Sequence, residues 1–234
     1  MKIWHISDTH TYHKLLTIPE NIDMVIFSGD CSNPRDPYLN EPEVRSFIHW
    51  FKELPIEHKI FVAGNHDTSI ERGLVTKLDF SGYNIHYLEN DYIHIDGIKI
   101  FGSPVTPSFG DGWAFNKNRM KLDKHWSQID DDTDIIIVHG PPKTILDLSY
   151  SRDHNLEYCG CNALKRHILG RIRPKLCCFG HIHNNEDIIN AGTLKLSSYP
   201  TLFSNGSIVT DGKFGKLSSN GNILKICSDR KSVV

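Results

Sequence analysis

Five short segments of this chain carry side chains that could bind metal ions. They are Asp8-Thr9-His10, Gly29-Asp30, Gly64-Asn65-His66-Asp67, Val138-His139-Gly140 and Gly180-His181-Ile182-His183. Hard and borderline divalent ions take carboxylate oxygen, amide oxygen and imidazole nitrogen as ligands. Seven side chains offer such atoms: Asp8, His10, Asp30, Asn65, His139, His181 and His183. These donors are enough for two ions, each with positions left for water or a substrate.

The elements that must position these donors are predicted by the residues in front of them. Four of the five segments directly follow a short apolar run, at residues 3–6, 24–27, 60–63 and 135–138, and a shorter run at 177–179 precedes the fifth. Runs of this kind are typical of buried strands. The residue beyond the carboxyl end of a strand lies at the rim where α/β sheets bind ligands. We therefore expect the donors to gather at one edge of a sheet.

The spacing of the donors suggests how they divide the work. Asp8-Thr9-His10 and His181-Ile182-His183 each place two donors one residue apart, so both members of a pair can point to the same side. Asp30 is the natural carboxylate to bridge two ions, while Asn65 offers a neutral oxygen and His139 an imidazole. One aspartate after a strand is usually only a turn or cap residue. The occurrence of all five segments in order is what predicts a metal site.

The remaining elements complete the expected fold. Helices are expected near residues 41–53, 68–80, 117–128 and 161–171. Pro42 suits the first turn of the first helix, and Thr68 with Glu71 forms a capping-box pattern for the second. Alternating residues at 84–105 around Asp96-Gly97 predict a hairpin, and strands are expected in the tail from 187 to 228. The pattern favours an α/β protein with a two-sheet mixed β-sandwich flanked by helices.

Composition narrows the class of protein. The 234 residues suffice for one large domain, and we expect a single domain over 1–234. Hydrophobic residues at 39% and charged residues at 23% are ordinary for a globular protein. A net charge of -2 gives no electrostatic case for wholesale nucleic-acid or membrane binding. The 14 histidines fit a site that uses imidazole.

The cysteines and the N-terminus bear on the compartment. The six cysteines lack a repeated Cys-x-x-Cys pair, which argues against a zinc knuckle. Cys159-Gly160-Cys161 leaves a redox pair open as a minor alternative, while Cys177 and Cys178 are expected to be buried strand residues. The chain enters a strand at once, with no secretory segment and no apolar run that could span a bilayer. We expect a cytoplasmic, reducing compartment.

In their order, the five segments resemble the signature of the calcineurin-like metallophosphoesterase superfamily: Asp-x-His, Gly-Asp, Gly-Asn-His-(Asp/Glu), a lone His and Gly-His-x-His. Within it, the chain resembles the small MPPED-type (metallophosphoesterase-domain-containing) phosphodiesterases. That narrower likeness rests on Ile6-Ser7-Asp8-Thr9-His10, Gly102-Ser103-Pro104, Trp113-Ala114-Phe115-Asn116, His139-Gly140-Pro141-Pro142 and Arg173-Pro174-Lys175-Leu176. Phe203-Ser204-Asn205-Gly206-Ser207 resembles that group's Asn-Ala-Ser stretch but departs from it at Gly206.

The resemblance implies a four-layer fold and phosphoester hydrolysis by a hydroxide that bridges two divalent ions. It assigns Asp8, His10, Asp30 and His183 to the first ion, and Asp30, Asn65, His139 and His181 to the second. Manganese is the expected metal, with iron, zinc or nickel as alternatives. His66 is implied to be the general acid, although a purely orienting role stays open. Asp67 is expected to orient its turn or cap the following helix.

The expected substrate is a small phosphoester. Phosphodiesters are favoured, in particular small nucleotide or cyclic nucleotide diesters, because few cationic side chains stand ready for a dianionic monoester. Arg35 and Arg152 could add a positive contact, while Trp113 and Phe115 could flank a base or aryl group or pack into the core. His13 could reach the mouth of the site.

Other functions stay open at this stage. No Gly-rich phosphate loop supports the use of nucleotides as an energy source. A nuclease, nucleotidase or phosphomonoesterase could use the same centre, so nucleic acid is a possible but not favoured partner. A metal-binding scaffold is less favoured, because no ligand position is lost. The sequence leaves the oligomeric state undetermined.

Overall fold

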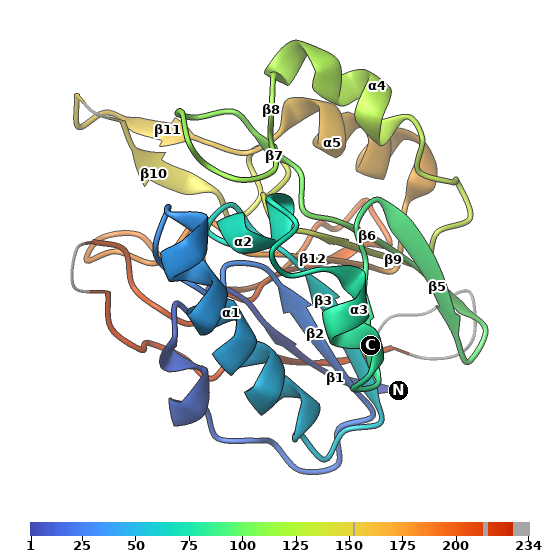
Figure 1. Cartoon of the computed structure of the whole chain (residues 1–234). Coiled ribbons are helices and arrows are strands. Elements are labelled where there is room, and N and C mark those ends of the chain that lie inside the picture. The colour runs from blue at the N-terminus through green and yellow to red at the C-terminus, as the bar shows by residue number, and fades with distance from the viewer. Residues whose placement is uncertain (152, 213–214, 227–234) are drawn as a thin grey trace.

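The computed structural model describes residues 1–151, 153–212 and 215–226, and two main sheets organise them (Figure 1). The first sheet has five strands in the order β15-β1-β2-β3-β4. Their bounds are β1 Lys2–Ile6, β2 Met24–Ser28, β3 His58–Val62, β4 Ile85–Tyr87 and β15 Asn222–Lys225. Strands β1 to β4 are parallel, and β15 pairs with β1 in the antiparallel direction.

The second sheet has six strands in the order β13-β14-β12-β9-β6-β5. Their bounds are β5 Asp91–Ile95, β6 Ile98–Ser103, β9 Ile135–Val138, β12 Leu176–Phe179, β13 Gly192–Lys195 and β14 Leu202–Asn205. The four central strands are parallel, whereas β5 and β13 are antiparallel edge strands. Both sheets are therefore mixed, as expected.

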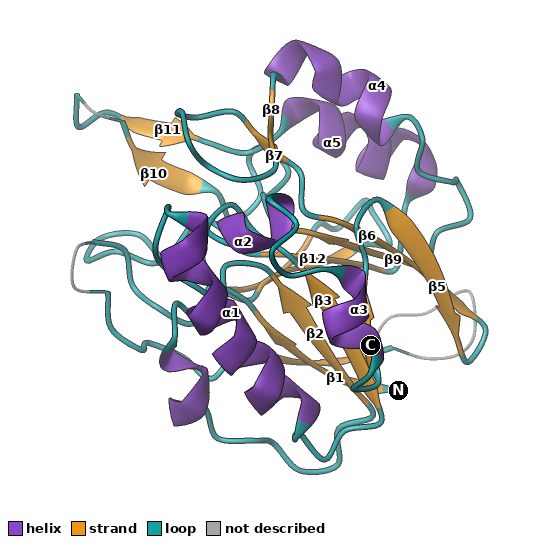
Figure 2. Ribbon diagram, viewed as in Figure 1, coloured by secondary structure: helices purple, strands orange, loops and turns teal. Residues whose placement is uncertain are grey.

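Helices lie on the outer faces of the two sheets (Figure 2). The first sheet is flanked by α1 (Pro37–Lys52), α2 (Thr68–Glu71) and α3 (Lys77–Ser81). The second is flanked by α4 (Leu122–Trp126) and by α5 (Asn162–His167), which continues into the π-turn η3 (Ile168–Ile172). Two short 3-10 turns, η1 (Tyr12–Leu15) and η2 (Arg119–Lys121), complete the helical elements of the described residues.

The core consists of three apolar layers, and successive side chains of the central strands point alternately into two of them. On β1, Ile3 belongs to the cluster between the sheets, which also contains Ile137 of β9. The next residue, Trp4, joins the cluster beneath α1 with Phe47. On β9, Ile136 joins the cluster beneath α4 and α5. A strand covered on both faces is apolar at most positions, which is why these strands are recognisable as apolar runs in the sequence. The expected sandwich flanked by helices is confirmed.

The first helix begins earlier than predicted. It starts at Pro37, because the Asp36 carboxylate accepts hydrogen bonds from the backbone N–H groups of Tyr38 and Leu39. Pro37, and not Pro42, is the proline of the first turn, and Pro42 falls inside the helix. The prediction for Pro42 was wrong, because the capping aspartate one turn upstream decides where the helix begins.

The single helix predicted for 68–80 was also wrong. The chain forms α2 and α3 with a break between them at Gly73, whose φ is 73°. The capping box belongs to α3, where Thr76 and Asp79 bond each other's backbone N–H groups. The Glu71 carboxylate instead accepts a hydrogen bond from the Phe115 backbone N–H at 2.7 Å. Glu71 thus makes a tertiary hydrogen bond in place of the helix cap that the local sequence pattern predicted.

Several shorter elements complete the chain. The hairpin of β5 and β6 around Asp96-Gly97 is confirmed. The helix predicted for 117–128 is shorter, as η2 followed by α4. A hairpin of β10 (Leu148–Tyr150) and β11 (Leu156–Tyr158) was not predicted, and Figure 1 shows it projecting from the body. A further short pair joins β7 (Thr106–Pro107) to β8 (Asn116–Lys117).

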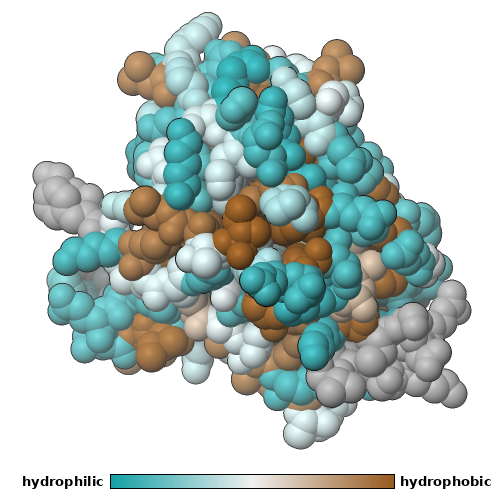
Figure 3. Space-filling view, turned by 90° about the horizontal axis from the view of Figure 1, so that it is seen from below, coloured by the Kyte–Doolittle hydropathy of each residue, from teal (hydrophilic) through white to brown (hydrophobic). Residues whose placement is uncertain are grey.

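The surface mixes apolar and polar residues. On the face seen in Figure 3, hydrophobic patches are interrupted by hydrophilic side chains, as on most folded proteins. In the part of the chain that the structure describes, no helix is both long and apolar enough to cross a bilayer. Cys177 and Cys178 are fully buried, as predicted for strand residues. Cys161 is buried and accepts a hydrogen bond from a backbone N–H at the start of α5.

His13 is buried and does not reach the site. Its ring packs against Phe47 and Trp50 with centroid separations of 5.4 Å, and neither ring nitrogen has a hydrogen-bond partner among the described residues. Burial therefore lowers the pKa of His13 to about 4.

This burial leads to a prediction about stability. The unfolded chain binds the His13 proton near pH 6.5 and the folded chain only near 4. The stability that the neutral His13 ring contributes is thus complete above pH 6.5 and is lost as the pH falls from 6.5 toward 4. We expect His13→Phe to reduce the fall in unfolding free energy between pH 7 and 5 by about 1–2 kcal/mol. Urea unfolding of both proteins at the two pH values measures it, and an unchanged pH dependence would contradict it.

Candidate metal centre

The five segments meet where the carboxyl ends of the central strands of both sheets adjoin. The segments of Asp8, Asp30 and Asn65 follow β1, β2 and β3 of the first sheet. Those of His139 and His181 follow β9 and β12 of the second. The site is therefore built by two sheets, and not by one sheet edge as the sequence suggested. The tertiary structure brings together all seven candidate donors.

Three groups of side chains could each hold an ion, with ligand atoms within 4.8 Å of one another. They are Asp8, His10 and His183; Asp30, His139 and His181; and His10, Asp30 and His66. The first two groups are separate, and the third joins them through His10 and Asp30. Asp30 thus stands between two candidate ion positions, where a bridging carboxylate has to be.

Two of the histidines are held in a tautomer that suits an ion. The Nδ1–H of His10 donates to the Ser32 carbonyl at 3.0 Å, and the Nδ1–H of His139 donates to the Ser28 carbonyl at 2.8 Å. A carbonyl can only accept, so the proton lies on Nδ1 and the lone pair on Nε2. Metal-binding histidines in proteins are commonly oriented by such a bond on the other nitrogen.

The surroundings of His139 Nε2 show that the donors fit a cation. This atom lies 3.0 Å from Asn65 Oδ1 and 3.2 Å from Asp30 Oδ2. With the ring proton on Nδ1, three lone pairs meet, an arrangement that a proton or a metal ion must stabilise. Burial lowers the pKa of His139, but the charge of Asp30 outweighs it and raises the pKa to about 9. A divalent ion would satisfy the same three atoms.

Two other candidate ligands, His10 and His181, are neutral at neutral pH. Burial lowers the pKa of His10 to about 4 and that of His181 to about 3. Metal binding to imidazole requires the deprotonated ring. Burial therefore keeps both lone pairs available over the physiological pH range.

The Asp8 carboxylate is fixed by bonds from three segments. It accepts from the His181 backbone N–H at 3.0 Å and from Ser207 Oγ at 2.7 Å, and His183 Nε2 lies 3.1 Å away. Burial raises its pKa, but His183 and the other nearby imidazoles hold the pKa well below its usual range. Ser207 did not emerge as a site residue from the sequence, although it lies in the stretch that resembles the MPPED group.

A second buried carboxylate, Asp67, holds the backbone around Asp30. It accepts hydrogen bonds from the backbone N–H groups of Asp30, Cys31 and Gly64 and from Ser32 Oγ. Its predicted role in orienting the turn is confirmed, while its side chain makes no cap to α2. The Asp30 carboxylate in turn accepts from the His66 backbone N–H at 2.7 Å through Oδ1, which leaves Oδ2 facing His139.

Backbone conformation at the site is costly. Asp8, His10, Asp30 and His181 have φ values of 52°, 40°, 62° and 69°, in the left-handed region that glycine favours. Residues held there cost of order 1–3 kcal/mol each and cluster at functional sites. Gly180 is needed for a different reason: a Cβ there would collide with Ser7 Oγ and Asp8 Oδ2. The local structure gives up stability to aim these donors.

His66 lies at the wall of the site. Its Nδ1–H donates to the Asn33 carbonyl at 2.9 Å, so Nε2 is the free nitrogen. Its ring lies 4.7 Å from that of His10, and its carbonyl accepts from the amide of buried Asn40 at 2.8 Å. Asn40 is a positioning residue that the sequence did not reveal, since it lies on α1 far along the chain. The geometry allows His66 to serve as a proton donor or as a ligand.

Two adjoining hollows meet at His66. The first, of about 190 Å³, is lined by Asp30, Asn65, His66, Phe109, Trp113, Ser149, His181, Ile182, His183 and Asp211. The second, of about 860 Å³, shares His66, His183 and Asp211 with the first and is otherwise mostly polar. A substrate at the donors can therefore extend in two directions from His66.

The residues predicted to contact the substrate lie in different places in the structure. Trp113 lines the first hollow, whereas Phe115 packs against the core beneath α1. The guanidinium of Arg35 lies 3.8 Å from the centre of the Trp113 ring, and Arg152 lies outside the described residues. The Asn205 side chain donates a hydrogen bond to the Ile182 carbonyl at 2.9 Å. This bond holds the loop that carries His181 and His183.

Comparison with known proteins identifies the relatives of this chain. A profile of the calcineurin-like phosphoesterase family matches residues 1–185. Human metallophosphoesterase domain-containing protein 1 is 31% identical over 228 residues, which cover 88% of this chain and 65% of the human protein. A UPF0046 protein of Caenorhabditis elegans is 31% identical over 209 residues, with 82% and 67% coverage.

Among solved structures, the chain is similar to a hypothetical protein from Thermus thermophilus. The TM-score is 0.47 at 14% identity, with 90% of this chain and 78% of the other covered. A likeness of this size carries no argument about function. The chain spans 65% of the length of its human relative, so the activity of that whole protein does not transfer to it.

Proposed function

This chain belongs to the calcineurin-like phosphoesterase family, and we propose that it is a phosphodiesterase that uses two divalent ions. The observation that carries the proposal is the position of Asp30, which shares one ligand group with His139 and His181 and another with His10. A single carboxylate between two sets of nitrogen and oxygen donors is what a two-ion centre requires.

We assign the ligands as the family resemblance implies. Asp8, His10, Asp30 and His183 would hold one ion, and Asp30, Asn65, His139 and His181 the other. When bound, the two ions would lower the pKa of water, neutralise phosphate charge and align the reacting groups. The donors are oxygen and imidazole nitrogen without thiolate, which supports manganese and is compatible with iron, zinc or nickel.

We assign His66 as the general acid. In its protonated form, Nδ1–H donates to the Asn33 carbonyl and Nε2–H can donate to the departing oxygen. After the transfer, the ring keeps the tautomer that the Asn33 carbonyl favours. The bond from Asn40 to the His66 carbonyl holds the backbone of the same residue, so the donor is presented from a rigid turn.

The hollow at the donors supports diesters over monoesters. None of the described residues that line it is lysine or arginine, and the nearby Arg35 is stacked on Trp113. A dianionic monoester confined to this hollow would meet no lysine or arginine, whereas a diester carries one charge fewer. Cationic side chains line only the neighbouring hollows among those described: Lys216 the second hollow, and Arg119 with Lys143 a hollow behind Phe109 and His181. The second hollow leaves room for the second organic substituent that distinguishes a diester. Small nucleotide or cyclic nucleotide diesters are the substrates we propose.

Two further proposals concern the chain as a whole. The pairing of β15 with β1 ties the late strands to the first, which supports a single domain over residues 1–234. The described cysteines, Cys31, Cys159, Cys161, Cys177 and Cys178, are all free thiols, which is compatible with a reducing cytoplasmic compartment and gives no support to a Cys159–Cys161 disulfide.

The substrate class is tested by comparing two nitrophenyl esters under the same Mn²⁺ loading. We expect a higher kcat/KM for bis-(4-nitrophenyl) phosphate than for 4-nitrophenyl phosphate, because the diester needs fewer fixed cations. Protein stripped of metal with a chelator is the control and should be inactive on both. A preference for the monoester would favour a phosphatase. Rapid degradation of single-stranded DNA with little small-diester activity would favour a nuclease.

A further inference from the structure

Two aromatic side chains form a wall beside the candidate donors. Phe109 and Trp113 lie in the loop between β7 and β8, and both line the smaller hollow. Phe109 is 44% exposed and Trp113 is half-buried. Their ring centroids are 5.9 Å apart with an angle of 31° between the planes. We call this pair the aromatic wall.

The aromatic wall touches the site directly. The Trp113 ring lies 4.4 Å from the ring of His66, and the Phe109 ring lies 5.0 Å from that of His181. One ring therefore contacts the candidate proton donor and the other contacts a candidate ligand. A substituent on a phosphate held at the donors would meet these rings next.

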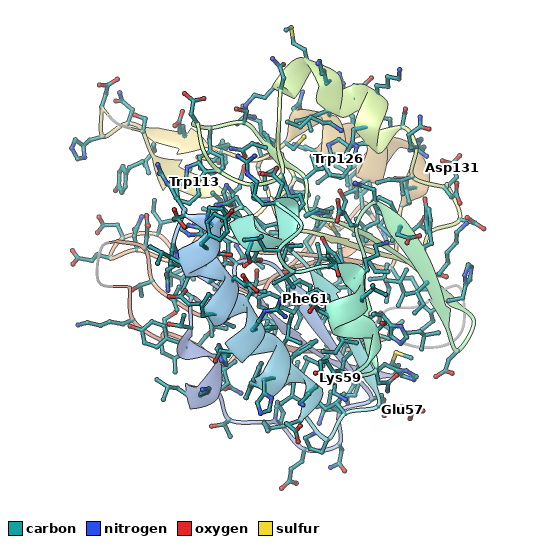
Figure 4. All side chains as sticks on the ribbon, viewed as in Figure 1. Glu57, Lys59, Phe61, Trp113, Trp126 and Asp131 are labelled. Carbon is teal, nitrogen blue, oxygen red and sulfur yellow. The ribbon has the colours of Figure 1, made fainter. Side chains whose placement is uncertain are left out.

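The loop that carries the wall is tied to the same segments as the donors. The Ala114 N–H, next to Trp113, donates to the backbone carbonyl of Asn65 at 3.0 Å. The guanidinium of Arg35 covers the Trp113 ring at 3.8 Å, a contact worth about 0.5–1 kcal/mol at exposed sites. In Figure 4, Trp113 lies by the end of α1 near α2, and Lys59 lies at the far end of the sheet. These contacts fix the position of the aromatic wall relative to the candidate donors.

We propose that the aromatic wall binds the planar substituent of the substrate, a nucleobase or an aryl group, with Phe109 as the exposed stacking surface. Every base has a π-face, so a half-exposed ring at a phosphate site recognises bases without reading their sequence. Trp113, the other member of the wall, packs against the His66 ring. This inference rests on the proposed phosphoesterase function and adds the class of substituent that the site selects.

The test is direct binding, measured by calorimetry on the Mn²⁺-loaded protein. Two pairs of ligands share a phosphate and differ in the planar group: 5′-AMP against ribose 5-phosphate, and phenyl phosphate against methyl phosphate. We expect the wild type to bind the first member of at least one pair about ten-fold more tightly. The pair that shows the preference tells a nucleobase from an aryl group.

Variants locate the preference. Phe109→Ala should remove the preference, and Phe109→Trp should retain it, because the larger ring still stacks. Tyr83→Ala is a matched control: Tyr83 is 45% exposed beneath the Lys52 ammonium at 4.4 Å, but lies in the hollow between α1 and α3. It should leave both affinities unchanged.

Two results would overturn the inference. One is a wild type with no preference for the planar ligand in either pair, and the other is a preference that survives Phe109→Ala. The outcome is separable from the proposed function. A base preference that depends on Phe109, in a protein without diesterase activity, would support the binding role of the aromatic wall and contradict the phosphodiesterase function. Diester hydrolysis without such a preference would support the function and contradict the binding role.

Discussion

Replacing Asp30 by asparagine is expected to abolish turnover and to leave fewer than two ions per chain. The amide keeps the shape of the side chain and can still accept the hydrogen bond from the His66 backbone N–H through its Oδ1. It removes the negative charge that lies between the two groups of donors. Loss of the two-ion arrangement should cost several kcal/mol of transition-state stabilisation, or about 10³-fold or more in rate.

Elemental analysis and turnover of bis-(4-nitrophenyl) phosphate measure this effect on the same samples. Asp91→Asn serves as the control, because Asp91 is a surface carboxylate whose partner is Lys77 and which lies on edge strand β5. That variant should retain both metals and activity. Active wild-type protein with a single ion, or an Asp30→Asn variant that keeps two ions and full turnover, would contradict the assignment of Asp30 as the bridge.

Replacing His66 by alanine is expected to lower turnover by about 10²–10⁴-fold on esters with an alkoxide leaving group. Metal content should stay nearly unchanged, because the two groups that hold the assigned ligands do not include His66. A nitrophenolate leaves without a proton, so the loss on a nitrophenyl ester should be much smaller. The difference between the two substrates is the signature of a general acid.

Metal analysis and an alkyl–nitrophenyl substrate comparison separate this role from the alternative. His66 also belongs to the third group of candidate ligands with His10 and Asp30, so a ligand role makes a distinct prediction. Equal losses on both substrates together with lost metal would assign His66 as a ligand. His94→Ala, at an exposed position on β5, is the matched control and should behave as the wild type.

The central strands were predictable from the sequence, whereas the β10–β11 hairpin was missed and the helices were predictable only in part. The strands β1, β2, β3, β9 and β12 are buried on both faces, so each is mostly apolar, with His5, Ser28 and Lys59 as buried polar exceptions. The ends of helices depend on whether particular side chains cap the helix or form hydrogen bonds elsewhere. Asp36 moved the start of α1, and the contact of Glu71 with Phe115 took away the predicted cap of α2.

The aromatic residues near the site show the same division. Trp113 and Phe115 are two positions apart in one loop, and the sequence could not decide which of them faces a substrate. Only the folded loop turns Trp113 to the hollow and Phe115 to the core. Phe109 was missed altogether, because an isolated aromatic residue in a loop has no pattern that predicts its neighbours.

The sequence by itself determined the seven candidate metal donors and their positions at strand ends. This information is local, since the residue that follows a buried strand must emerge at the rim of the sheet. The tertiary structure decided which partners hold several of the site residues. The carbonyls of Ser28 and Ser32 orient His139 and His10, the Ser207 hydroxyl bonds Asp8, and the Asn40 amide bonds the His66 carbonyl. These partners come from distant segments, and hydrogen bonds between them depend on how two sheets pack, which no short pattern of residues encodes.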